Sequence, residues 1–223
     1  MTTKKFVVDV GNEYGQRIFN PSKRVERECM KKILHLCADI GSDSKPYKDA
    51  GYNVICVGSK IGVENYHPPE NVYGIIANPP CTMFSIARTN AKTPRNIQEG
   101  LFCVKECLRI IWEAQSYMIA KHVPHKLKFW VLENPYTGYL KNYLGKPAFV
   151  YHPYEYGENY TKATALWGNF NAPPKTHWMN EAPKGRSISE VFPKMKYRNK
   201  EELMHVRSMC CEQFAKAFFK YNQ

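Results

Sequence analysis

Residues 72–81 read VYGIIANPPC, and this stretch decides the class of fold. Its first six residues, Val72 to Ala77, are an apolar run that is typical of a buried strand. Two prolines follow, and the strand ends there because proline donates no hydrogen bond to a ladder. The stretch therefore predicts a buried strand of an α/β sheet, with Cys81 directly beyond its carboxyl end.

Short apolar runs and helical patterns alternate on both sides of this strand. Residues 97–120 carry apolar side chains at helical spacing and predict the longest helix. In the closing helix, predicted over residues 200–221, Phe214 and Phe218 are placed to pack on a sheet. This order predicts an open, mostly parallel sheet with ligands beyond the carboxyl ends of its strands. The other predicted elements are strands at 33–38, 53–57, 128–132, 148–151 and 163–167, and a helix at 47–50 that Gly51 caps.

The length of 223 residues is that of one domain. We expect a basic N-terminal extension over residues 1–31, with an edge strand at Phe6 to Val10. The α/β domain then occupies residues 32–223. Within it, a segment rich in Pro, Lys and Asn at about residues 169–200 is expected to be mostly loop.

Thirty-two Lys and Arg residues against twenty Asp and Glu give a formal charge of +12. This excess favours a polyanionic partner, above all nucleic acid, although many basic proteins bind no polyanion. The apolar runs are too short to cross a bilayer, so no membrane role is expected. The first residues lack a secretory signal, which predicts a cytoplasmic protein with reduced cysteines. No set of Cys and His has zinc spacing, so no metal is expected.

Cys81 and Glu133 each follow a predicted strand, and prolines restrict the backbone beside both. A thiol in this position can act as a nucleophile, although most cysteines are small buried hydrophobes. Desolvation raises the pKa of a carboxyl group beside a core, which suits acid catalysis, although a solvated carboxylate is the simpler interpretation. Together the two groups indicate a nucleophile with an acid partner.

Four segments resemble those of cytosine-5 DNA methyltransferases. Residues 79–85, PPCTMFS, look like the catalytic loop of that family, and residues 133–135, ENP, look like its Glu-Asn-Pro element. Residues 156–168, which begin with Tyr156-Gly157, are similar to the segment that follows. Residues 207–222 resemble the closing helix of small phage-type members. The resemblance covers the chain from about residue 32 to its end.

This resemblance implies a Rossmann-like class I methyltransferase fold, with helices on both faces of a mostly parallel sheet and a reduced or absent target-recognition domain. It implies transfer of a methyl group from S-adenosylmethionine to carbon 5 of cytosine in DNA. Only about forty residues lie between Gly168 and Arg207, where sequence-reading members carry a much larger target-recognition domain, so relaxed sequence specificity is expected. Cys81 would add to carbon 6 of a flipped-out cytosine, and Glu133 would protonate or hydrogen-bond ring nitrogen 3. The likeness to phage-type members also implies that a phage protein in the cytoplasm of a bacterial host is one source of such a chain.

The resemblance also assigns the substrate contacts. In the segment where the family has Gln-x-Arg-x-Arg, Lys162 stands for the first arginine and Thr164 for the second. Lys92 and Arg95 lie in the loop that closes over the base in family members, although they can equally be a solvated basic face. The substrate contacts so assigned are Ser85, Arg88, Asn134, Pro135, Lys162 and Thr164.

The cofactor contacts depart further from the family pattern. Asp39 stands where the family has the first glycine of a turn after the first strand, and Gly41 keeps the second. After the second strand, Val57-Gly58-Ser59 lacks the acidic residue that would bind the ribose hydroxyls, and Glu64 is placed to receive the adenine amine. The cofactor contacts so assigned are Asp39, Ile40, Gly41, Glu64, Asn78 and Pro80.

Three other interpretations stay open. Asn78-Pro79-Pro80 also resembles an element of methyltransferases that act on exocyclic amines, but Cys81 stands where those need an aromatic residue. The changes at residues 39, 58 and 164 also suit a degenerate methyltransferase fold that binds nucleic acid or a nucleotide without transfer. The altered pocket could also serve a different one-carbon cofactor in the modification of cytosine.

Overall fold

The computed structural model describes residues 30–86, 88, 91–120, 127–177, 187–193 and 196–223. The residues from Lys31 to Gln223 form one compact unit. The strand predicted at residues 6–10 lies outside the described residues.

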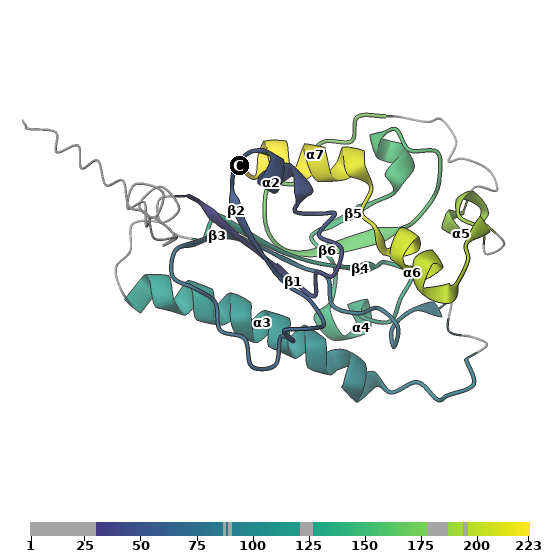
Figure 1. Ribbon diagram of the computed structural model, residues 1–223, viewed down its shortest axis with the longest axis horizontal. Coiled ribbons are helices and arrows are strands. Elements are labelled where there is room, and N and C mark those ends of the chain that lie inside the picture. Colours follow the sequence, from purple (N-terminus) through teal and green to yellow (C-terminus); the bar gives the residue numbers. More distant parts are fainter. Residues whose placement is uncertain (1–29, 87, 89–90, 121–126, 178–186, 194–195) are drawn as a thin grey trace, which may run out of the picture. The chain divides into compact units, whose positions relative to one another are not determined.

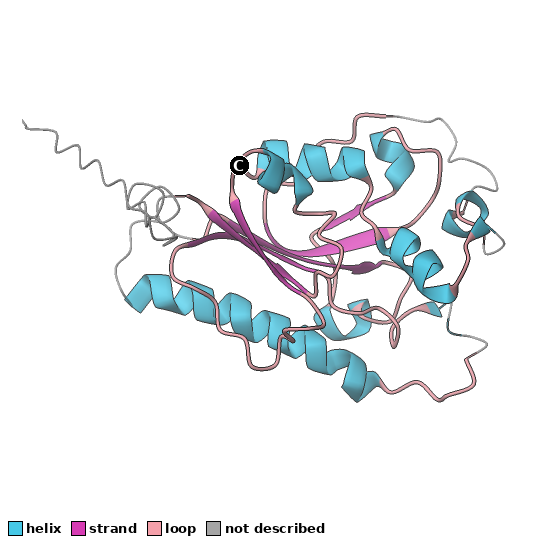
Figure 2. Cartoon of the chain, in the orientation of Figure 1, coloured by secondary structure: helices cyan, strands magenta, loops and turns pink. Residues whose placement is uncertain are grey.

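A six-stranded sheet forms the centre of this unit (Figures 1 and 2). Its strands lie in the order β2-β1-β3-β4-β6-β5, and the first four are mutually parallel. Strand β6 runs antiparallel to β4 and to β5. The predicted α/β class with a mostly parallel, Rossmann-like sheet is therefore confirmed. The strands are β1 (Lys32–Leu36), β2 (Asn53–Val57), β3 (Val72–Ala77), β4 (Phe129–Pro135), β5 (Phe149–Tyr151) and β6 (Thr164–Asn169).

Helices cover both faces of the sheet (Figure 1). On one face, α3 (Ile97–Ala120) contributes Val104 and Ile111 to a buried cluster with the side chains of β1 and β3. On the other face, α2 (Lys45–Asp49) and α7 (Glu212–Tyr221) form a second cluster through Tyr47, Phe214 and Phe218. Each fully buried side chain of this size contributes about 1.5–3 kcal/mol, so these clusters hold the helices to the sheet.

Short helices complete the described part of the chain. They are α4 (Lys141–Leu144), the 3-10 helix η2 (Pro153–Tyr156), α5 (Ile188–Val191) and α6 (Lys200–Ser208). The helix predicted at residues 47–50 begins two residues earlier, at Lys45, and Gly51 follows it with a left-handed φ of 85°, as expected for a glycine cap. None of the described helices has both the length and the apolarity that a membrane span requires.

The closing helix, predicted as one element, is two helices. Between α6 and α7, Met209 and Cys211 have extended backbone with ψ of 140° and 121°. The backbone amide of Cys210 donates to Ser42 Oγ at 3.0 Å. The prediction of a continuous helix was therefore wrong, because the chain leaves helical geometry where it contacts the turn after β1.

Strand β4 is longer than predicted, and this places the Glu-Asn-Pro element inside the sheet. The prediction ended the strand at Leu132. In the structure, Glu133 lies opposite Leu166 and Pro135 lies opposite Thr164 in the antiparallel ladder with β6. Pairing with a strand much later in the sequence extends β4, so the position of Glu133 is set by the ladder rather than by a loop.

Candidate active site

Cys81 lies in a tight turn directly beyond β3. The backbone amides of Phe84 and Ser85 donate to the carbonyl oxygen of Cys81 at 2.9 and 2.8 Å. From β4, the fully buried side chain of Asn134 donates through Nδ2 to the carbonyl oxygen of Pro79 at 2.9 Å. This contact holds the turn to the neighbouring strand and places the half-buried thiol at the end of the sheet.

Cys81, Glu133 and Lys162 act on one another electrostatically. Burial raises the pKa of the Cys81 thiol, the Glu133 carboxylate raises it further, and Lys162 acts in the opposite direction. Burial also raises the pKa of Glu133, which Lys162 opposes and Asp43 reinforces. A raised pKa keeps Glu133 protonated to a higher pH than an ordinary carboxyl group, and protonation is the state that a proton donor needs.

Asn78, just beyond β3, connects the two carboxyl groups of the site. Its Nδ2 lies 3.4 Å from both Glu133 Oε2 and Asp43 Oδ1, which is the long limit of a hydrogen bond. Its Oδ1 lies 2.7 Å from His35 Nε2. The residue was predicted as a cofactor contact, and in the structure it lies between Asp43 and the proposed proton donor.

His35 is buried in β1 and orients Asn78. Since Asn78 Nδ2 faces the carboxyl groups, its Oδ1 accepts a hydrogen bond from His35 Nε2, and Ser44 Oγ lies 2.8 Å from His35 Nδ1. Burial lowers the pKa of His35 although Asp43 acts in the opposite direction, so the imidazole is neutral at ordinary pH. His35, Asp43 and Ser44 were not predicted from the sequence. The available signal was a histidine inside the otherwise apolar end of β1.

A pocket lies beside Glu133, lined by residues of β3, β4 and β6 on one side and of α7 on the other. Figure 1 labels these elements. Asp43 and Glu133 form its polar part, and Phe214 and Phe218 from α7 contribute to the apolar part. This lining places the Asp43 carboxyl group beside Glu133, next to an apolar wall. In the described part of the chain, no group of three His, Cys, Asp or Glu side chains could hold a metal ion.

Asp39 reaches from the end of β1 to the end of β2. Its Oδ1 accepts hydrogen bonds from the backbone amide and the hydroxyl of Ser59, at 2.7 and 3.0 Å. Gly58 makes room for this contact, because a Cβ there would lie 2.3 Å from the same oxygen. The acidic residue at position 39 and the glycine at position 58 are therefore in direct contact in the structure.

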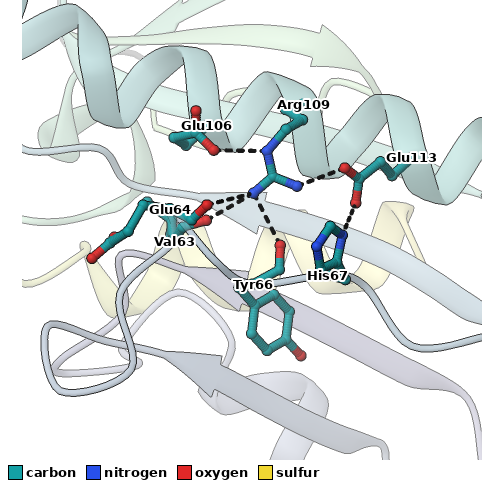
Figure 3. A network of polar contacts seen from close by, with 7 residues as sticks. All are labelled: Val63, Glu64, Tyr66, His67, Glu106, Arg109 and Glu113. Atoms are coloured by element: carbon teal, nitrogen blue, oxygen red, sulfur yellow. Dashed lines mark hydrogen bonds and ion pairs between the residues drawn. The ribbon is translucent and has the colours of Figure 1, made fainter.

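Arg109 of α3 holds the loop that carries Glu64 (Figure 3). Its guanidinium donates to backbone carbonyl oxygens of that loop at 3.0 to 3.4 Å and pairs with two carboxylates of its own helix. The carboxylate of Glu64 is exposed and points away from Arg109 (Figure 3). Arg109 therefore fixes the backbone of the loop and leaves Glu64 open to a ligand. The acceptors of Arg109 are Val63, Glu64, Tyr66, Glu106 and Glu113.

Two predicted substrate contacts bond to nearby backbone. The Arg88 guanidinium donates to the carbonyl oxygens of Thr93 and Pro94 at 3.1 and 3.2 Å. Thr164 is buried, and its hydroxyl donates to the carbonyl oxygen of Lys162 at 3.0 Å. Lys162 itself lies near Cys81 and Glu133 and donates to the carbonyl oxygen of Arg207 at 3.2 Å.

Three other predicted contacts, Ile40, Gly41 and Pro80, lie on turns beyond strands, and a fourth, Pro135, lies at the end of one. Gly41, with a left-handed φ of 72°, and half-buried Ile40 form the turn after β1. Pro80 is exposed before Cys81, and Pro135 is the last residue of β4. The structure thus gathers Asn78, Cys81, Glu133 and Lys162 in one site.

The sequence matches no family model, and no curated protein matches it. Among solved structures, the chain is similar to EhMeth, a methyltransferase of Entamoeba histolytica, with 12% sequence identity and a TM-score of 0.39. The match covers 71% of this chain and 58% of that one, so the chain spans less than two thirds of that protein's length. At this TM-score the likeness bears on neither activity nor substrate, and the activity has to be judged from the site residues.

Proposed function

We propose that the chain is a cytosine-5 DNA methyltransferase that uses S-adenosylmethionine and forms a covalent adduct through Cys81. The observation that carries this proposal is the placement of Cys81 beyond β3 and of Glu133 near the end of the paired strand β4, within electrostatic reach of each other. Addition to cytosine needs a nucleophile and a proton donor in one site. The motif resemblance supports the same reaction and the same two residues.

Carbon 5 of cytosine becomes nucleophilic only after addition at carbon 6. In the proposed reaction, the Cys81 thiolate forms a bond to carbon 6 while a proton moves from Glu133 to ring nitrogen 3, so no negative charge builds up on the ring. Carbon 5 then takes the methyl group. Loss of the carbon-5 proton to water drives cleavage of the bond between carbon 6 and sulfur, which restores the ring double bond and releases Cys81 as the thiolate. The proton on ring nitrogen 3 returns to Glu133, so the site is ready for another cycle.

The electrostatics of the site support the role of Glu133, whereas burial disfavours the thiolate of Cys81 and Lys162 opposes that effect. The raised pKa of Glu133 keeps it protonated before the addition, and Lys162 favours the thiolate form of Cys81. Asn78 holds Glu133 from one side, and buried His35 fixes the orientation of Asn78. The network therefore positions the proton donor, while the turn beyond β3 positions the nucleophile.

The turns after β1 and β2 fit S-adenosylmethionine, which would supply the methyl group on a sulfonium. With Oδ1 of Asp39 held by Ser59, its second oxygen is available to accept from a ribose hydroxyl. Asp43, in the pocket beside Glu133, offers a negative charge to the ammonium or sulfonium group. Glu64 presents an exposed carboxylate to the adenine amine.

Trapping of the adduct tests the proposal. Cytosine with fluorine at carbon 5 has no proton to lose there, so the adduct should accumulate when the protein is incubated with S-adenosylmethionine and an oligonucleotide that contains this base. Mass spectrometry should find the added mass on the peptide that contains Cys81, and none in Cys81→Ala. An adduct on another cysteine would contradict the assignment of the nucleophile.

A second candidate function is binding of nucleic acid or a nucleotide without transfer. The raised pKa of Cys81 favours it, because a protonated thiol is a poor nucleophile. Calorimetric titration with S-adenosylmethionine followed by the adduct assay separates the two functions. Binding followed by adduct formation supports the enzyme, whereas binding of cytosine-containing DNA without any adduct supports the second candidate.

A further inference from the structure

The two segments that follow β3 and Glu133 contain no acidic residue. Residues 79–98 and residues 134–154 together hold five basic residues and not one Asp or Glu. A surface built from such segments is complementary to a polyanion. The five basic residues are Arg88, Lys92, Arg95, Lys141 and Lys146.

The second of these segments exposes three tyrosines. Tyr136, Tyr139 and Tyr143 are 38%, 44% and 51% exposed, although the rings of tyrosine are usually largely buried. Basic groups lie against two of them. The ammonium of Lys141 lies 4.4 Å from the ring centroid of Tyr136, and the guanidinium of Arg95 lies 4.9 Å from that of Tyr139. We call these five residues the tyrosine surface.

The tyrosine surface is joined directly to the turn of Cys81. The backbone amide of Tyr139 donates to the carbonyl oxygen of Phe84 at 2.9 Å. Gly138 permits this approach, because a Cβ there would lie 3.1 Å from the same oxygen. Arg95 also donates to the carbonyl oxygens of Met83 and Ser85. A ligand on the tyrosine surface would therefore lie beside the turn that begins at Cys81.

We propose that the tyrosine surface binds an unpaired stretch of a polynucleotide strand, with bases stacked on the tyrosine rings and phosphates on the basic residues. Exposed aromatic rings among basic groups are the features that bind single strands without reading their sequence. In a duplex the faces of the bases are covered by their neighbours, so these rings could not stack on them. An unpaired cytosine also reaches Cys81 without the cost of leaving a duplex. The inference rests on the proposed function, because it names the form of the substrate.

Fluorescence anisotropy with a labelled single strand of about twelve nucleotides that contains no cytosine tests this inference. The single strand should bind at least tenfold more tightly than the duplex of the same sequence. The double variant Tyr139→Ala, Tyr143→Ala should lose about tenfold in affinity for each stacked base, which corresponds to about 1.4 kcal/mol per base. Trp112→Ala is the matched control, since Trp112 is 68% exposed on α3 and should leave the affinity unchanged.

Equal binding of duplex and single strand, or unchanged affinity in a folded double variant, would overturn the tyrosine surface. Thermal unfolding of each variant shows that it is folded. Because the probe lacks cytosine and needs no cofactor, the result does not depend on Cys81. Single-strand binding without any adduct would support the tyrosine surface as a binding site and contradict the proposed methyltransferase activity. An adduct formed equally well on duplex would support the proposed methyltransferase activity and contradict the role of the tyrosine surface in binding a single strand.

Discussion

The two halves of the site hold their functional side chains in different ways. At the proposed catalytic end, formed by Asn78, Cys81 and Glu133, the ladder between β4 and β6 and the bonds of a tight turn set the positions. At the cofactor end, formed by Asp39, Gly58, Ser59 and Glu64, one side chain reaches across from β1 to β2 and one loop is held by Arg109. The proposed catalytic end carries the residues that resemble cytosine-5 methyltransferase motifs, whereas the proposed cofactor end departs from them.

This difference indicates what each kind of chemistry requires. A nucleophile and its acid partner must lie in a fixed geometry, so the sheet positions both. A carboxylate that binds a hydroxyl needs only to occupy the right place, and either of two neighbouring strands can supply it. We therefore expect that no second substitution restores the activity lost at the proposed catalytic end. At the proposed cofactor end, a second substitution should restore the affinity for S-adenosylmethionine.

The largest effect is expected for Cys81→Ala, which removes the bond-forming atom. Both methyl transfer and the fluorocytosine adduct should fall below detection, while the melting temperature should change by no more than a few degrees, because the substitution removes one heavy atom and leaves the backbone bonds of the turn in place. The same substitution at exposed Cys56 is the control and should retain full activity. Activity retained in Cys81→Ala would break the assignment of the catalytic end.

Glu133→Gln should slow methyl transfer by about a hundredfold or more, the usual contribution of a positioned proton donor. It should also change the pH dependence of stability. The folded state raises the pKa of Glu133, so the native protein should lose stability as pH rises from the ordinary carboxyl pKa through the raised value. Glutamine carries no charge and should not show this loss.

Melting temperatures of both proteins at pH 4, 6 and 8 measure this second effect. The advantage of Glu133→Gln over the native protein should grow with pH and then level off. Parallel curves would show that Glu133 is solvated as an ordinary carboxylate, and the proton donor would then have to be sought elsewhere.

The sequence was informative where contacts are local and uninformative where they are distant. The strand predicted at residues 72–77 matches β3 residue for residue. An apolar run between turn signals predicts a buried strand from the local sequence alone. The break between α6 and α7 could not be seen, since its contact joins Cys210 to Ser42, 168 residues earlier. The extension of β4 likewise depends on β6, whose pairing no local pattern indicates.

The same reason explains which site residues were missed. Cys81 and Glu133 are identified by the prolines beside them, whereas His35 acquires its role only through Asn78, 43 residues later. Asp39 and Gly58 could be seen separately as departures from a motif. Their relation became evident only when the structure placed the carboxylate of one over the backbone of the other.

Exchanging these two residues tests the compensation at the cofactor end. Asp39→Gly should weaken binding of S-adenosylmethionine by about tenfold, the effect of one lost hydrogen bond to a charged group. Gly58→Asp should also weaken it, because the new side chain meets the carboxylate of Asp39. The double variant should bind within about threefold of the native protein, since it returns one carboxylate to the end of β2.

Calorimetric titration of the four proteins measures the coupling. Losses that simply add in the double variant would mean that Asp39 and Gly58 act independently, and the two departures would then be separate defects of the cofactor site. Binding to the native protein that is unaffected by Asp39→Gly would remove Asp39 from the site altogether.

The smallest effect is expected for Arg109→Met, which keeps the apolar stem of the side chain and removes its donors. Because the guanidinium is partly exposed, loss of its contacts should cost about 1 kcal/mol and weaken cofactor binding only a few-fold. Hydrogen exchange should accelerate at the amides of residues 63–67 and stay unchanged in β4. Arg198→Met, which removes a 92% exposed arginine that precedes α6 and pairs with Glu202 in its first turn, is the control. Faster exchange in β4 would show that the ladder between β4 and β6 depends on the loop that Arg109 holds. The two ends of the site would then not be stabilised independently.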